Sequence, residues 1–133
     1  MYLCEVSKIV MGYFFRNKNK FNAVRTNGMG SKLEASVYQI LVLRERLGQI
    51  SDIKQQVLVD LSCGIRWKVD FSFLDKARDE IMYAEAKGVE TERYRLCLKL
   101  WRGGHGPGYL EVWKGSFQRP TLVEIIKPKT GGR

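Results

Sequence analysis

The chain has few of the residues that cross-link or interrupt a fold. Its 133 residues include only three prolines and three cysteines, while 44% are apolar, a balance that argues against disorder. Cys4, Cys63 and Cys97 form no C-x-x-C pair, so neither a disulfide framework nor a zinc ribbon is predicted. Cysteines of this kind suit a reducing compartment, and we expect a cytoplasmic protein.

Long apolar runs and clustered histidines are lacking as well. The apolar start "MYLCEVSKIVMGYFF" contains Glu5 and Lys8 and has no basic lead-in, so we expect neither a signal peptide nor a membrane span. The single histidine, His105, lies in a glycine-rich stretch without partners for zinc or nucleophilic chemistry. We interpret it as a solvated loop residue.

Acidic residues are outnumbered. The chain has 14 Asp and Glu against 23 Lys and Arg, which gives a net charge of +9 and a pI near 9.6. A charge of this size suits a polyanionic partner, and no long amphipathic basic helix points to a membrane surface. We therefore expect nucleic acid as the partner, although charge alone does not decide this, since many basic proteins bind none.

Hydrophobic spacing predicts one α+β domain (α/β in the broad sense) over residues 1–133, with the element order α-β-β-β-α-β-β. Residues 1–30 are predicted to form a basic N-terminal arm, and residues 127–133 a flexible tail. Apolar residues recur at helical spacing between Ser31 and the closing Gly48, at Leu33, Val37, Ile40, Leu41 and Leu47. The other predicted elements are strands at 53–61, 65–75 and 80–87, a helix at 92–102 capped by Thr91, and strands at 109–113 and 121–126.

A hairpin in the middle of the chain is predicted to bring two acids together. If residues 76–79 form its loop, Asp75 pairs with Glu80. Asp70 then lies directly opposite Glu85, and Lys68 lies opposite Lys87. Because side chains alternate, one face carries Lys68, Asp70, Glu85 and Lys87, and the other carries Val69, Phe71, Phe73, Met82, Ala84 and Ala86. Opposed like charges destabilise a sheet, and a divalent cation between Asp70 and Glu85 would explain them.

A third acid, Glu34, has two interpretations. In "SKLE" (31–34) it completes a capping box, in which Glu34 reaches back to the amide of Ser31. It also leads a helical stripe whose other members, Val37, Tyr38 and Leu41, are apolar, so it would lie at the core edge within reach of a metal. The two roles are compatible.

Other polar positions are weaker candidates. Asp52-Ile53-Lys54 opens its strand, and no strand bearing an acid precedes it, so we reject it. Asp60 could replace Asp70, but it lies outside the hairpin register. One of Gln55 and Gln56 could face the site, and an edge strand explains them equally well. The three tryptophans fit core positions better than base-stacking platforms; they are Trp67, Trp101 and Trp113.

The second predicted helix has a basic side. Arg95, Lys99 and Arg102 recur at i, i+4 and i+7, away from the apolar face formed by Tyr94, Cys97, Leu98 and Trp101. This side is either a solvated helix face or a track for DNA phosphates, and the arm could extend such a track through Arg16, Lys18, Lys20 and Arg25.

Taken together, these segments resemble the PD-(D/E)xK nuclease superfamily. "SKLEASVYQIL", "VDF" and "AEAKG" leading into a basic helix are similar to small phage-encoded nucleases related to phage endonuclease I, the junction-resolving type. "NKFNAVRTNG" before them and "T-x-x-Y-x-x-x-x-K-L" after them also resemble a phage branch of this group. The likeness covers residues 19–101 and rests on order and spacing, because E-x-K alone decides nothing. One departure is Val69, where the family often has proline before the aspartate.

The resemblance implies a restriction-endonuclease-like αβββαβ core, a mixed sheet flanked by helices, and Mg²⁺-dependent hydrolysis of DNA, with Mn²⁺ able to substitute. Carried over to this chain, Asp70, Glu85, the Ala86 carbonyl and Glu34 bind the metal, and Lys87 orients or activates the attacking water. The implied substrate is branched DNA such as a Holliday junction. Two coordinated cuts imply a homodimer, and the protein would act in the cytoplasm of a phage host.

The DNA contacts expected beside that site are Arg25, Lys68, Arg95, Lys99 and Arg102. Two other functions stay open. A nicking or restriction-type endonuclease on duplex DNA would use the same site, whereas a non-catalytic basic DNA-binding phage protein would bind DNA without cutting it.

Overall fold

The computed structural model describes residues 32–128. The predictions made for the basic arm, including Arg25, and for the Ser31 cap and residues 129–133 lie outside this range. No helix within it is long and apolar enough to cross a membrane.

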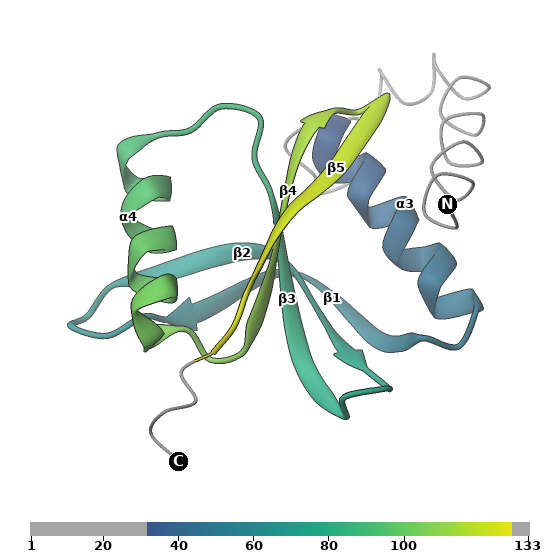
Figure 1. Ribbon diagram of the computed structural model, residues 1–133, viewed down its shortest axis with the longest axis horizontal. Helices are drawn as coiled ribbons and strands as arrows, with labels where there is room; N and C mark the ends of the chain where they lie inside the picture. The colour runs from purple at the N-terminus through teal and green to yellow at the C-terminus, as the bar shows by residue number, and fades with distance from the viewer. Residues whose placement is uncertain (1–31, 129–133) are drawn as a thin grey trace.

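Within residues 32–128, two helices flank a five-stranded mixed sheet (Figure 1). The elements in order are α3 (Lys32–Arg46), β1 (Ile50–Asp60), β2 (Arg66–Asp75), β3 (Glu80–Ala86), α4 (Glu92–Leu100), a wide π-type turn (Trp101–His105), β4 (Tyr109–Ser116) and β5 (Arg119–Ile126). The strands lie in chain order, and all neighbours are antiparallel except β3 and β4, which α4 joins as a parallel pair. The α+β class and the helix–strands–helix–strands order are as predicted.

The element ends differ from prediction at several places. The first strand begins at Ile50 rather than 53, since a bulge between Ser51 and Lys54 lets pairing with β2 continue. Leu47, predicted to continue the apolar stripe, lies beyond the end of α3 and is 52% exposed. The second helix is α-helical only as far as Leu100.

The glycine-rich stretch after α4 wraps around Trp101. The indole Nε1 donates to the Gly108 carbonyl at 2.8 Å. Gly106 lies so close to the ring that a Cβ there would come within 2.3 Å of it. The chain therefore needs glycine at 106 because a buried tryptophan occupies the space, which gives residues 103–108 a packing role.

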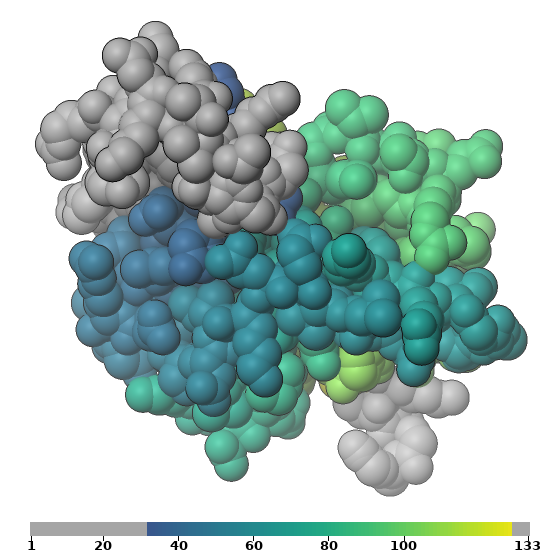
Figure 2. Space-filling model, turned by 180° about the vertical axis from the view of Figure 1, so that it is seen from behind, coloured from purple at the N-terminus to yellow at the C-terminus, as the bar shows by residue number. Residues whose placement is uncertain are grey.

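The two helices cover opposite faces of the sheet at β3 and β4, and Figure 1 shows them on either side of these strands. From behind, the blue atoms around α3 and the green atoms around α4 lie on opposite sides of the molecule (Figure 2). The cluster under α3 comprises Leu33, Ala35, Val37, Ile40, Leu41, Ile50, Phe71, Phe73, Met82, Ala84, Ala86 and Trp113. The cluster under α4 comprises Val59, Leu61, Trp67, Val69, Tyr94, Cys97, Leu98, Trp101, Leu110, Val112 and Ile126. All three tryptophans are in the core, as predicted.

Val69 is placed differently from its prediction. Strand alternation groups it with Phe71 and Phe73 under α3, yet it packs in the α4 cluster. The reason is that β2 pairs with β3 only from Phe71 onward, so its first half is left in a two-stranded ribbon with β1. Such ribbons twist more strongly than full sheets, and the same side of β2 turns toward the other helix.

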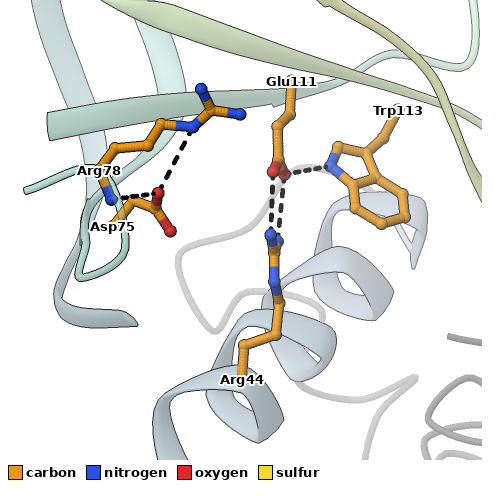
Figure 3. Close-up of polar contacts among 5 residues, drawn as sticks. All are labelled: Arg44, Asp75, Arg78, Glu111 and Trp113. Atoms are coloured by element: carbon orange, nitrogen blue, oxygen red, sulfur yellow. Dashed lines mark hydrogen bonds and ion pairs between the residues drawn. The ribbon is translucent and has the colours of Figure 1, made fainter. Parts of the chain in front are cut away.

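A buried ion pair ties α3 to the sheet (Figure 3). Glu111, in the middle of β4, is 1% exposed and accepts two hydrogen bonds from the Arg44 guanidinium, at 3.2 and 3.0 Å. The indole Nε1 of Trp113 donates to the same carboxylate at 3.1 Å. Three donors therefore compensate for the burial of this carboxylate.

Removal of Arg44 alone should be costly. Arg44→Met leaves Glu111 charged, buried and short of two donors, and we expect the free energy of unfolding to fall by about 3–5 kcal/mol in urea titrations. The double variant Arg44→Met/Glu111→Leu removes both charges and should recover part of that loss, since the Trp113 Nε1 then lacks its acceptor. A double variant as unstable as Arg44→Met would show that packing around Arg44, rather than the uncompensated charge, sets the cost.

Candidate functional site

Strands β2 and β3 separate at the predicted pair of acids. The register is the predicted one, with Asp75 opposite Glu80 and Phe71 opposite Ala84, but the ladder of paired residues ends there, one pair before Asp70 and Glu85. Beyond the Phe71–Ala84 pair, the carboxylates of Asp70 and Glu85 accept hydrogen bonds from main-chain amides, as strand carbonyls would in a continuous ladder. Glu85 Oε1 accepts from the Asp70 amide at 3.1 Å, and Asp70 Oδ2 accepts from the Ala86 amide at 2.9 Å.

Both carboxyls are buried, and burial alters their chemistry. Asp70 is 8% exposed and Glu85 is 4% exposed. Loss of solvation, followed by repulsion from Asp70, raises the pKa of Glu85 from its ordinary 4.5 to about 9. The pKa of Asp70 is raised as well, chiefly by burial, although the Ala86 amide and other hydrogen bonds oppose the shift. In the absence of a cation, the pair therefore holds at least one proton at neutral pH.

Glu34 joins this pair through a distortion of β1. Gln56 stands opposite Asp70 in the β1–β2 register, and its φ of 55° is uncommon for a residue other than glycine. Its side-chain amide donates to Glu34 Oε2 at 2.8 Å. Side-chain hydrogen bonds from both Glu34 and Gln56 act to lower the pKa of Asp70. The structure thus brings Glu34, buried at the start of α3, together with the two strand acids.

Lys87 follows directly on β3 and is held by two other segments. Its amide donates to the carbonyl of Trp113 in β4 at 3.2 Å, and its ammonium lies 5.8 Å from the ring centre of Tyr94 in α4. Its positive charge acts to lower the pKa of both Asp70 and Glu85.

The predicted pairing of Lys68 with Lys87 does not form. The β2–β3 ladder ends before it reaches them, and Lys68 pairs instead with Leu58 of β1 and is exposed. The separation of the two strands thus removes the like-charge contact that a continuous ladder would impose.

The basic side of α4 is exposed but is engaged in ion pairs. Arg102 forms a two-pronged pair with Glu124, at 3.0 and 2.7 Å, and an Arg95 nitrogen lies 3.7 Å from Glu90. Lys99 is exposed on the same side. All three residues are exposed, as the spacing predicted, although Arg102 lies just beyond the end of α4.

The rival positions lie apart from the acids. Asp60 pairs with Arg66 at 3.3 Å, and its side chain is 80% exposed, so it takes no part in the buried cluster. Asp52 is exposed in the β1 bulge region. His105 is an exposed residue, as expected, although its Nδ1 lies 2.6 Å from the Ser62 hydroxyl, a contact that the sequence did not suggest.

The donor set suits a hard divalent cation, since it consists of carboxylate oxygens. Within residues 32–128, however, no three His, Cys, Asp or Glu side chains are grouped so that they could hold a metal ion as they stand. The nearest arrangement is the Asp70–Glu85 pair with Glu34 linked to it by hydrogen bonds. Cation binding here requires loss of the protons that the pair now holds and convergence of the carboxylates.

The buried pair should make the metal-free protein less stable as pH rises. Between about pH 4.5 and 9 the folded protein keeps a proton on Glu85 that the unfolded chain releases. The free energy of unfolding therefore falls with pH across this window, by about 1.4 kcal/mol per pH unit for one such proton. Urea titrations at pH 5.5, 7 and 8.5 would measure the slope, and Glu85→Gln should flatten it. If Glu85→Gln showed the same dependence of the unfolding free energy on pH, the proton would have to reside on a group other than Glu85.

Comparisons of the chain with protein-family models, with curated proteins and with solved structures returned no match.

Proposed function

We propose that this protein is a Mg²⁺-dependent DNA endonuclease of the PD-(D/E)xK type, acting on branched DNA. The proposal rests above all on the Asp70–Glu85 pair. Two buried carboxylates face each other where β2 and β3 separate, and each accepts a hydrogen bond from a main-chain amide. Lys87 comes two residues after Glu85, directly beyond the end of β3. Such a pair destabilises the metal-free fold, and a bound cation would offset that cost.

The arrangement of elements also supports the proposal. The order α3, β1, β2, β3, α4 and β4 corresponds to the αβββαβ order that the resemblance implies. Asp70 comes from the second strand, Glu85 and Lys87 from the end of the third, and Glu34 from the preceding helix, as in the resemblance.

Each residue has a distinct role under this proposal. Asp70 and Glu85 supply the oxygen ligands, and Glu34 and the Ala86 carbonyl complete the set. When bound, Mg²⁺ lowers the pKa of water and stabilises negative charge on the phosphate. Lys87, held beside Glu85 by Trp113 and Tyr94, stabilises the hydroxide nucleophile electrostatically. Lys68, Lys99 and the arm residue Arg25 would contact phosphates, as would Arg95 and Arg102 once released from their acidic partners.

Incubation with labelled DNA tests both the chemistry and the substrate. Four-way, nicked, linear duplex and single-stranded DNA would be compared with Mg²⁺, Mn²⁺ or EDTA. We expect cleavage that needs the metal and favours the four-way form, and we expect a homodimer on that form by light scattering. Preferred cutting of linear or nicked duplex would indicate a restriction-type or nicking enzyme. Equal binding with and without metal, and no cleavage of any substrate, would indicate a non-catalytic DNA-binding protein.

A further inference from the structure

Lys114 lies beside Lys87 on the neighbouring strand. It follows Trp113, whose carbonyl accepts the Lys87 amide, so the parallel register of β3 and β4 brings the two lysines to the same end of the sheet. Both ammonium groups lie over the ring of Tyr94, at 5.8 Å for Lys87 and 5.3 Å for Lys114. Each ammonium group therefore has a favourable contact with the electron-rich ring.

Glu90 connects Lys114 to α4. One of its carboxylate oxygens contacts the Lys114 ammonium, and the other lies 3.7 Å from a guanidinium nitrogen of Arg95. The hydrogen bond and charge of Lys114, with a further contribution from Arg95, lower the pKa of Glu90. A single negative group with one oxygen on each of two cations occupies the position that a phosphate would take between them.

These ion pairs are accessible to solvent and exchangeable. The side chains of Glu90, Lys114 and Arg95 are 39%, 32% and 57% exposed. Exposed pairs of this kind contribute little to stability, so another anion can replace the carboxylate at small cost.

Tyr94, whose ring both lysines contact, has a buried hydroxyl without a hydrogen-bond partner among residues 32–128. Tyr94 is 2% exposed, and its hydroxyl is a buried side-chain atom of the described region that lacks a hydrogen-bond partner. Burial, with a contribution from the charge of Glu85, raises the pKa of this hydroxyl to about 12, so it stays a neutral donor. The ring that contacts both lysines therefore belongs to a residue whose hydroxyl has no partner in the described part of the DNA-free protein.

We propose that Lys114 and Arg95 form a phosphate-binding subsite beside Lys87, that Glu90 occupies it in the DNA-free protein, and that a backbone phosphate beside the cut bond displaces Glu90 on binding. This inference rests on the proposed nuclease function and adds to it a second phosphate position and an internal competitor for it. Glu90 then lowers the affinity for DNA while it keeps the cations in place.

Two variants with opposite effects test the subsite. Glu90→Gln removes the competitor, and Lys114→Met removes a cation but keeps an unbranched side chain. Lys76→Met, in the exposed β2–β3 loop at the other end of β3, is the matched control for loss of one positive charge. Binding of a labelled four-way DNA would be measured by fluorescence anisotropy in EDTA across a range of salt concentrations, so that no cleavage interferes.

We expect Glu90→Gln to bind about fivefold more tightly than the unchanged protein, the scale of one exposed ion pair. Lys114→Met should bind about fivefold more weakly, with a salt slope reduced by about one unit, as for one lost phosphate contact. Lys76→Met should behave as the unchanged protein does. In cleavage assays with Mg²⁺, Lys114→Met should raise KM more than it lowers kcat, because the subsite holds the substrate before and during reaction.

The outcomes separate this inference from the nuclease proposal. Opposite shifts in the two variants without any cleavage by the unchanged protein would support the subsite and overturn the enzymatic function. Normal binding and cleavage, with both variants indistinguishable from Lys76→Met, would overturn the subsite alone. Absence of DNA binding by the unchanged protein would overturn both.

Discussion

Asp70→Asn should abolish DNA cleavage and at the same time stabilise the metal-free protein. Asparagine keeps an oxygen that can accept the Ala86 amide, so the separated strands stay joined at this point. It removes a buried carboxyl whose charge helps to raise the pKa of Glu85, and we expect the free energy of unfolding to rise by about 1–2 kcal/mol at pH 8. It also removes a ligand that a hard cation prefers, so we expect cleavage to fall by roughly a thousandfold or more.

Cleavage with Mg²⁺ and urea unfolding without it would be measured on the same preparations of this variant. Asp60→Asn is the matched control, because Asp60 is exposed in the adjacent hairpin and was the rival position. It should cut DNA normally. Cleavage at the normal rate by Asp70→Asn would show that Asp70 is not part of the catalytic site. Loss of cleavage in Asp60→Asn alone would indicate that Asp60 takes the role proposed for Asp70.

Glu34→Gln should separate catalysis from helix stability. Glutamine keeps an oxygen that can accept the hydrogen bond from Gln56, and a capping box accepts Gln as well as Glu at this position. We therefore expect stability to change by less than about 1 kcal/mol. If Glu34 completes the ligand set, the loss of its charge should lower cleavage by roughly a hundredfold or more and raise the Mg²⁺ concentration needed for half-maximal activity.

The control for that variant lies on the same helix. Glu45→Gln makes the same change at an exposed position near the other end of α3 and should leave both activity and metal dependence unaltered. Near-normal cleavage by Glu34→Gln would restrict the site to Asp70, Glu85 and Lys87 and leave Glu34 with a structural role. A Mg²⁺ titration of activity, run beside thermal unfolding, distinguishes these results.

Local patterns in the sequence predicted much of this geometry. A four-residue loop at 76–79 fixed the β2–β3 register, because a hairpin register depends on its turn. Thr91 caps α4 as expected, through a 3.1 Å bond from the Tyr94 amide to its hydroxyl. The loop length alone was therefore enough to place the acids at 70 and 85 on facing strands.

Features that depend on tertiary packing were not predictable in this way. Termination of the β2–β3 ladder at Phe71 reflects competition, since buried carboxylates accept amide protons that strand carbonyls would otherwise take. Gln56, which lies opposite Asp70, has a left-handed backbone that no glycine or asparagine marked. The unusual pair of glutamines in a strand was the one available signal.

The roles of Lys114, Glu90 and Glu111 were missed for a related reason. A parallel pair has no hairpin to set its register, so the sequence could not show that Lys114 lies beside Lys87. Glu111 did carry a signal, as an acid in the middle of the apolar segment "YLEVW", which called for a buried cation such as Arg44.

The parallel pairing of β3 and β4 also sets an order in which the site can assemble as the chain folds. Asp70 and Glu85 belong to one hairpin, so they meet through contacts between residues close in sequence, which form early. Lys87 is anchored by Trp113 and Tyr94, which both come later in the chain, and β4 can dock only after the α4 crossover is in place. During synthesis the acids therefore come together first, and the lysine is fixed only when the last hairpin has joined the sheet.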